Sequence, residues 1–280
     1  MATAHTVDVP GAHLYYEVRG SGPLLLLLGA PMSAAHFAPL ADALAGDHTV
    51  VTTDPRGISG SPVDDPEQDS TPDLRADDVA AILDDLGADA ADVFGSSGGA
   101  VTGLALVARH PSRVRTLVAH EPPLLTLLPD AAEQLATSDD IVATCHRDGP
   151  GAAFAKFMAQ AGFVGGGDES GDDESGGDDG APVPQEGESS EEELRDGVRF
   201  LTHELSGTVR YAPDVDALTA GPARVVVGLG ADSGALLTQH TTTALTTLLG
   251  TEPTIFPGDH GGFLGQPAEF AEALRKALAG

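Results

Sequence analysis

The segment that most constrains this chain is a short apolar run that ends in a glycine-rich turn. Residues 91–100 read ADVFGSSGGA, so a predicted strand enters the turn GSSGG at 95–99 and a predicted helix follows at once. A serine framed as G-x-S-x-G between a strand and a helix is typical of a nucleophile held on a sharp, strained turn. Side chains at Gly95 and Gly99 would collide there with the neighbouring strand and helix. We therefore predict that Ser97 is a nucleophile.

The same turn excludes two other kinds of glycine-rich site. A Walker phosphate loop needs G-K-[ST], and the G-x-G-x-x-G spacing of a dinucleotide site is also missing from residues 91–100. The N–H of Gly98, at the start of the predicted helix, is instead expected to donate to an oxyanion, with support from the helix N-terminus. No H-E-x-x-H pair occurs in the sequence and nothing pairs its histidines as ligands, so we expect neither a metal nor a cofactor.

Around this segment, short apolar runs alternate with helical patterns, which favours a parallel sheet wrapped by helices. The predicted helices include 73–86, 100–109 and 267–278. The sequence thus predicts an α/β protein with an eight-stranded, mostly parallel sheet flanked by helices. The eight candidate strands are 6–9, 13–18, 24–28, 49–53, 91–94, 116–120, 224–229 and 252–257.

The alternation fails between residues 124 and 213, where an apolar helical pattern takes over. We interpret this stretch as a helical cap inserted into a core domain formed by 1–123 and 214–280; the alternative is a set of extra core helices. Within the cap, residues 165–193 carry twelve acidic side chains and no basic one, which predicts a disordered acidic loop. The sequence Ser-Glu-Glu-Glu at 190–193 resembles a capping box that would restart a helix toward Phe200.

Charge restricts the classes of partner. The chain has 43 acidic and 14 basic residues, a formal charge of −29, which repels nucleic-acid backbones and anionic membranes. The most apolar run, Leu24–Leu28, is far shorter than the roughly 20 residues that span a bilayer. The single Cys145 cannot form an internal disulfide. We expect a cytoplasmic protein, monomer or homodimer, that binds neither nucleic acid nor membrane.

Together with two further segments, the turn resembles that of the α/β-hydrolase superfamily, in its serine-nucleophile, esterase- or lactonase-like branch. The sequence LGAP at 28–31 resembles the family's oxyanion loop, which usually has His-Gly where this chain has Leu28-Gly29. The resemblance implies that the N–H of Ala30 is a second oxyanion donor. Residues 51–61, VTTDPRGISGS, are similar to the family's D-x-R-G-x-G-x-S segment, with Asp54 and Arg56 in structural roles.

A serine hydroxyl needs a base that is held by a carboxylate. The family's chain order of serine, acid and histidine implies that His260, in GDHGGF at 258–263, is the base. Two positions are open for the acid. Asp232 follows the strand 224–229, the family's usual place, whereas Glu121 follows the strand 116–120 and precedes two prolines. A carboxylate that ends an apolar strand in this way favours Glu121, and Asp232 remains the alternative.

These residues lead to a functional hypothesis. Ser97 would attack an acyl carbonyl, His260 would move the proton, and the N–H groups of Ala30 and Gly98 would hold the oxyanion. The apolar cap and the acidic surface favour a small-to-medium, apolar carboxylic ester or lactone as the substrate. The alternative is a non-hydrolytic protein on the same scaffold, such as a ligand receptor, a biosynthetic cyclase or an acyltransferase, because a fold does not fix a function.

Overall fold

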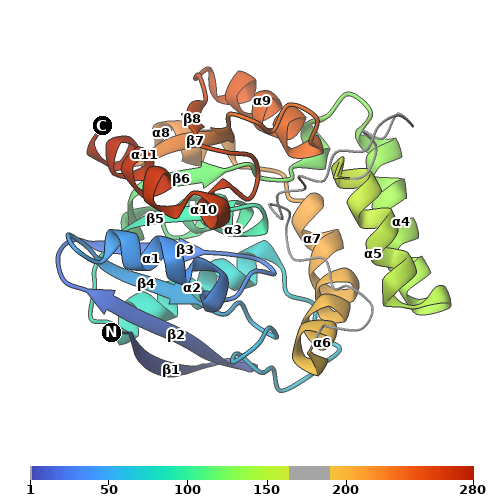
Figure 1. The fold of residues 1–280 in the computed structure, drawn as a ribbon, viewed down its shortest axis with the longest axis horizontal. Coiled ribbons are helices and arrows are strands. Elements are labelled where there is room, and N and C mark those ends of the chain that lie inside the picture. The colour runs from blue at the N-terminus through green and yellow to red at the C-terminus, as the bar shows by residue number, and fades with distance from the viewer. Residues whose placement is uncertain (1, 164–189) are drawn as a thin grey trace, which may run out of the picture.

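The described residues, 2–163 and 190–280 of a computed structural model, form an eight-stranded sheet with the order β1-β2-β4-β3-β5-β6-β7-β8 (Figure 1). Strand β2 runs antiparallel to both of its neighbours, and the remaining pairs are parallel. All eight predicted strands are present and differ from the prediction only at their ends. The strands are β1 (Thr3–Val9), β2 (Ala12–Gly20), β3 (Leu24–Leu28), β4 (Thr49–Thr53), β5 (Ala91–Ser96), β6 (Val114–His120), β7 (Arg224–Gly230) and β8 (Thr254–Phe256).

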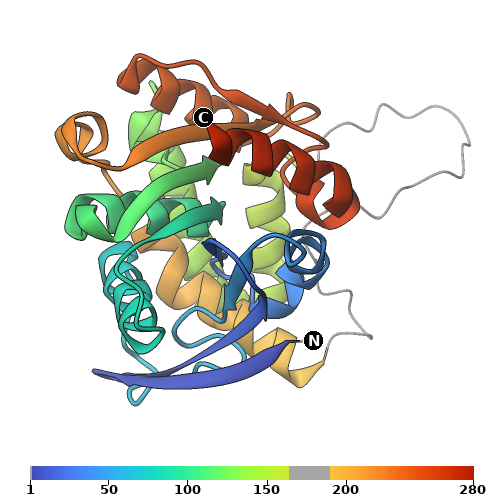
Figure 2. The same ribbon diagram turned by 90° about the vertical axis from the view of Figure 1, so that its left-hand side faces the viewer.

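Helices cover both faces of the sheet (Figures 1 and 2). One face carries α1 and α11 with the short α10, and the other carries α2, α3, α8 and α9. These helices are α1 (Ala38–Leu44), α2 (Pro72–Asp85), α3 (Gly98–Arg109), α8 (Val215–Ala220), α9 (Leu237–Leu249), α10 (Gly262–Gly265) and α11 (Pro267–Ala279). The arrangement is the predicted α/β fold.

The all-leucine strand β3 shows why the middle of the sheet is so apolar. Leu25 and Leu27 join the apolar layer under α1 and α11, whereas Leu26 and Leu28 join the layer under α2 and α3. Successive side chains of a strand point to opposite faces, so a strand covered on both faces must be apolar at every position. Such a strand is fixed at the centre of the sheet, and its carboxyl end leads directly into the loop that carries Ala30.

A helical insertion separates β6 from β7 and lies beyond the carboxyl ends of the central strands (Figure 1). Its buried apolar side chains, among them Ile141, Leu201 and Leu205, form a cluster separate from the two layers of the sheet. The insertion contains α4 (Ala131–Asp148), α5 (Pro150–Ala161), α6 (Glu191–Arg199), a π-helical segment (Phe200–Glu204) and α7 (Leu205–Val209).

Most of the predicted acidic loop, residues 165–189, lies outside the described residues. The predicted capping box is confirmed at the start of α6: the Ser190 hydroxyl accepts from the Glu193 N–H at 3.2 Å, and the Ser190 N–H donates to the Glu193 carboxylate at 2.8 Å. The predicted end of the loop at residue 193 is therefore too late, because residues 190–193 are the N-cap and first turn of α6. Within 2–163 and 190–280, no helix has the length and apolar character needed to cross a membrane.

Candidate active site

Ser97 lies on a strained turn between β5 and α3. Its φ is 56° and its ψ is −123°, in a region that non-glycine residues rarely adopt. A Cβ atom at Gly95 would lie 2.4 Å from the Gly99 carbonyl oxygen, and one at Gly99 would lie 2.0 Å from the Leu28 carbonyl oxygen. Ser97 is partly exposed, whereas the residues on either side of it are buried. The glycines thus permit close packing while the turn presents the serine side chain.

The two predicted oxyanion donors are neighbours. A Cβ atom built on Gly98 would lie 2.4 Å from the Ala30 carbonyl oxygen, so these two backbones are in close contact. The loop that follows Ala30 is fixed by Asp54, whose carboxylate accepts from the N–H of Ala34 at 2.8 Å and from the N–H of Gly60 at 2.9 Å. Asp54 therefore joins the loops after β3 and β4, in keeping with the structural role predicted for it.

The carboxylate of Glu121 holds His260. The histidine Nδ1 lies 2.7 Å from Glu121 Oε2, and the glutamate side chain is completely buried. Two other groups donate to the same carboxylate, the N–H of Gly230 and the hydroxyl of Thr238, each at 2.8 Å. Burial disfavours the charged carboxylate, but the hydrogen bond from His260 and the neighbouring imidazoles outweigh it and lower the pKa of Glu121 to about 2. Glu121 is therefore ionised at neutral pH.

Strand register brings Ser97 and Glu121 to one edge of the sheet. Ser97 follows β5 and its N–H donates to the His120 carbonyl at 2.9 Å, while the next residue, Glu121, donates its N–H to the Gly228 carbonyl at 3.1 Å. Glu121 has a φ of 50°, which turns its chain away from the ladder. Among the hydrogen bonds of the described residues, none joins the Ser97 hydroxyl to His260; such catalytic contacts are often long until substrate binds.

A family model for the alpha/beta hydrolase fold matches residues 22–163. The uncharacterized hydrolase YraK of Bacillus subtilis is 32% identical over 278 residues, which cover 98% of this chain and 95% of YraK. The chain belongs to the α/β-hydrolase family. Its fold resembles an esterase from Thermogutta terrifontis (TM-score 0.71, 19% identity, 100% and 98% of the two chains covered). It also resembles the enol-lactonase from Burkholderia xenovorans LB400 (TM-score 0.63, 17% identity, 99% and 100% covered).

Asp232, the other position considered for the acid of this α/β-hydrolase, has no hydrogen bond or ion pair with His260 among the described residues. Its residue is exposed, and its backbone N–H donates to the Gly258 carbonyl at 2.9 Å. The structure therefore brings Glu121 to His260 and leaves Asp232 at the surface. The donor that sequence reasoning missed is Thr238, on α9, a helix that had not been predicted; nothing in the local sequence marks this threonine.

His120, directly before Glu121, lies close to His260. Its ring is fully buried, 6.3 Å from the His260 ring between centroids, and its Nδ1 lies 3.2 Å from the Ser96 hydroxyl. Burial lowers the pKa of His120 to about 4, so this ring is neutral at physiological pH. In the part of the chain that the structure describes, no group of three or more His, Cys, Asp or Glu side chains is placed to hold a metal ion.

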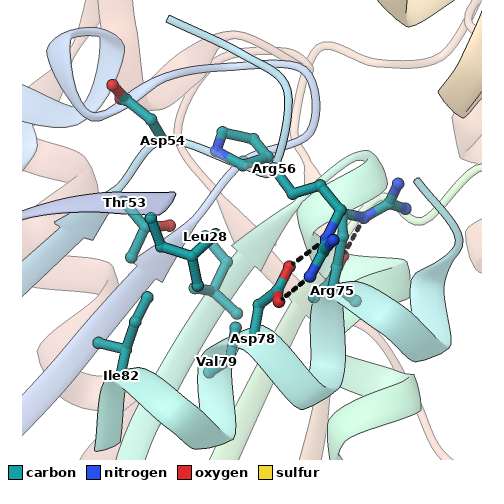
Figure 3. Close-up of a pocket in the computed structure, with 12 residues that line it drawn as sticks. Leu28, Thr53, Asp54, Arg56, Arg75, Asp78, Val79 and Ile82 are labelled. Carbon is teal, nitrogen blue, oxygen red and sulfur yellow. Dashed lines mark hydrogen bonds and ion pairs between the residues drawn. The ribbon is translucent and has the colours of Figure 1, made fainter. Parts of the chain in front are cut away.

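Two hollows lie near these residues, and Ser97 lines neither. A cavity of about 20 Å³ lies behind the oxyanion loop, beside the buried pair of Arg56 and Asp78 (Figure 3). That pair is a two-point ion pair with N–O distances of 2.9 and 2.5 Å, so Arg56 also fixes structure, as predicted. An open groove of about 450 Å³ lies between α4, α5 and α9 and is lined by Leu128, Pro129, Asp130, Gln134, Gln160, Gly162, Ala235, Leu237 and His240.

Proposed function

We propose that this chain is a serine hydrolase that cleaves an apolar, small-to-medium carboxylic ester or lactone through an acyl-enzyme on Ser97. One observation carries the proposal. A completely buried carboxylate, Glu121, holds Nδ1 of His260 at the same sheet edge where Ser97 lies on a strained turn. A nucleophile, a base and an orienting acid in this chain order and setting suit acyl transfer.

The geometry supports a role for each group. With Nδ1 of His260 bonded to Glu121, Nε2 is the atom free to take the proton from the Ser97 hydroxyl as its oxygen bonds to the substrate carbonyl carbon. The N–H groups of Gly98 and Ala30 would donate hydrogen bonds to the resulting oxyanion. The histidine then protonates the leaving alcohol, and a water molecule, deprotonated by the same nitrogen, releases the acid and restores the serine.

The surroundings support an uncharged, apolar substrate. The Phe163 ring lies 6.2 Å from the His260 ring, so an aromatic surface adjoins the base. The groove beside α5 and α9, which Ser97 does not line, has no Lys or Arg among its lining residues and carries the acidic Asp130, so it would not attract an anion. Esterase and lactonase neighbours on the same fold are consistent with this chemistry, since both reactions pass through the same tetrahedral species.

Covalent labelling tests the proposal. A fluorophosphonate probe is expected to modify the wild-type protein at Ser97, and Ser97→Ala should abolish labelling and lower turnover of an activated ester by about 10⁴–10⁶. The neighbouring Ser96, which is completely buried, provides the matched control, because Ser96→Ala should keep the label at position 97. A folded Ser97→Ala protein with unchanged turnover would show that the proposal is wrong.

A further inference from the structure

Arg75 connects three parts of the molecule from a completely buried position in the first turn of α2. Its Nε donates to the hydroxyl of Thr102 on α3 at 2.9 Å, and its Nη2 donates to the hydroxyl of Thr208 on α7 at 2.9 Å. Its Nη1 donates to the carbonyl of Ser70 at 2.5 Å. The guanidinium, which Figure 3 shows above α2, therefore joins the insertion to the helix that follows Ser97.

Thr102 carries this connection to the turn of the nucleophile. Its hydroxyl donates to the Gly98 carbonyl at 3.1 Å and accepts from Arg75, so both of its hydrogen-bonding roles are used. Gly98 is the residue whose N–H is proposed to hold the oxyanion, and its Cα packs against the Ala30 carbonyl. A shift of Thr102 would thus change the spacing between the two oxyanion donors.

The counterion of Arg75 is held loosely. Glu204, at the end of the π-helical segment, is completely buried, and its Oε2 lies 4.0 Å from Nη1 of Arg75, beyond hydrogen-bonding distance. Neither carboxylate oxygen has a hydrogen-bond partner within the described ranges. Short π-helical segments are often found at functional sites. Arg75 directs its hydrogen bonds to neutral oxygens on α3, on α7 and before α2, whereas Glu204 makes no hydrogen bond to the guanidinium.

We propose that Arg75 is a positioning residue that couples the insertion, through Thr208, to the oxyanion donor Gly98, through Thr102. The proposal rests on the serine hydrolase function proposed above and adds a residue to it. The insertion then influences the rate of the chemical step as well as the binding of substrate, because α7 and the first turn of α3 share one guanidinium.

The buried ion pair of Arg56 and Asp78 provides a comparison for Arg75. Arg56 donates two hydrogen bonds to Asp78, which lies on the same helix as Arg75, and this pair ties α2 to the loop after β4. Its charges are matched directly by two charge-assisted hydrogen bonds. Arg75 has its nearest carboxylate at 4.0 Å and donates to side chains of two other elements instead.

Two substitutions at one position separate positioning from packing. Thr102→Ser keeps the hydroxyl and removes a methyl group, whereas Thr102→Val keeps the volume and removes the hydroxyl. We expect kcat on an activated ester to fall about tenfold in Thr102→Val, with KM nearly unchanged, and to stay within about twofold of wild type in Thr102→Ser. A purely structural role predicts that kcat follows the thermal stability of the two variants instead.

A transition-state analogue reports on the oxyanion site itself. The affinity for a trifluoromethyl ketone, which forms an anionic adduct with the serine, should fall in Thr102→Val by the same factor as kcat/KM. Thr208→Val, on the insertion side of Arg75, should lower both by a few fold. The matched control is Thr242→Val on α9, a buried threonine whose hydroxyl has no partner among the described residues and whose loss should change neither quantity.

The outcomes distinguish the two proposals. If wild type is labelled at Ser97 but Thr102→Val has the same kcat and the same ketone affinity as Thr102→Ser, the positioning role is wrong and the serine hydrolase function stands. If Thr102→Val loses activity and Thr208→Val does not, the coupling to the insertion is wrong. If fluorophosphonate fails to label folded wild type, both proposals are wrong.

Discussion

Two glutamates of this protein are equally buried and have opposite surroundings. Glu121, at the end of β6, receives hydrogen bonds from the N–H of Gly230, the hydroxyl of Thr238 and His260. Glu204, at the end of the π-helical segment of the insertion, receives none within the described residues. Hydrogen bonds and the imidazoles lower the pKa of Glu121 to about 2 against its burial, whereas burial raises the pKa of Glu204 to about 7. Burial alone therefore does not decide the charge of a carboxylate; the donors around it do.

The two shifts affect stability in opposite directions. The pKa of Glu121 is lower in the folded than in the unfolded chain. The ionised carboxylate therefore contributes to the free energy of unfolding above pH 4.5, and this contribution is lost as the pH falls toward 2. The pKa of Glu204 is raised, so the folded state binds the extra proton and stability decreases as the pH rises from 4.5 to 7. The charged groups that act on Glu204 are Arg75 on α2 and Arg199 and Asp196 on α6.

The largest expected effect tests whether Glu121, the buried carboxylate with hydrogen-bond donors, is the acid that orients His260. Glu121→Gln keeps the size of the side chain but removes the charge that orients His260, so kcat should fall by about 10³–10⁴. Asp232→Asn is the matched control, because Asp232 is exposed and the change should stay within about twofold. Steady-state kinetics on an activated ester measures both. Equal effects at the two positions would mean that the contact between Glu121 and His260 is not the functional one.

The next effect concerns Glu204, whose carboxylate has no hydrogen-bond partner among the described residues, and its influence on the stability of the protein. Glu204→Gln removes a charge that burial disfavours, so at pH 8 the free energy of unfolding should rise by roughly 3 kcal/mol, on the basis of a pKa of about 7. The gain should disappear below pH 4.5, where the carboxyl is protonated in both states. Urea unfolding at several pH values measures it. Destabilisation at pH 8 would show instead that Arg75 needs this charge as its counterion.

The smallest effect makes the surroundings of Glu121 more like those of Glu204. Thr238→Val removes the hydroxyl that donates to Oε2 at 2.8 Å and nearly keeps the volume. A hydrogen bond to a charged group contributes about 1.5–3 kcal/mol, so stability at pH 7 should fall by about that amount and the pKa of Glu121 should rise. Thr243→Val, on the exposed side of the same helix, is the control. Urea unfolding at several pH values measures both changes. If Thr238→Val unfolds at low pH like the wild type, the remaining donors alone keep the pKa of Glu121 low.

Much of the fold could be predicted from the sequence because local pattern and local structure agree in the core. Strand β3 is a run of leucines because both of its faces are covered, and a run buried on both faces can be recognised from the sequence alone. The turn at Ser97 could also be predicted from local sequence, since close contacts with Leu28 and Ala100 require its glycines. Helix α9 was missed because threonines fill both its buried and exposed positions, which leaves a weak helical pattern.

By itself the sequence determined the candidates, which are Ser97, His260 and two carboxylates, because motifs on consecutive residues specify a turn and the residues beside it. Only the tertiary structure decided that Glu121 contacts His260 while Asp232 lies at the surface, and only it showed the network of Arg75, Thr102 and Thr208. The physical reason is that a charge acquires its pKa and its orientation from donors distant in the chain. The Nδ1 of His260 and the hydroxyl of Thr238 bond to Glu121 although they lie more than a hundred residues away in the chain. No local sequence pattern predicts such a contact.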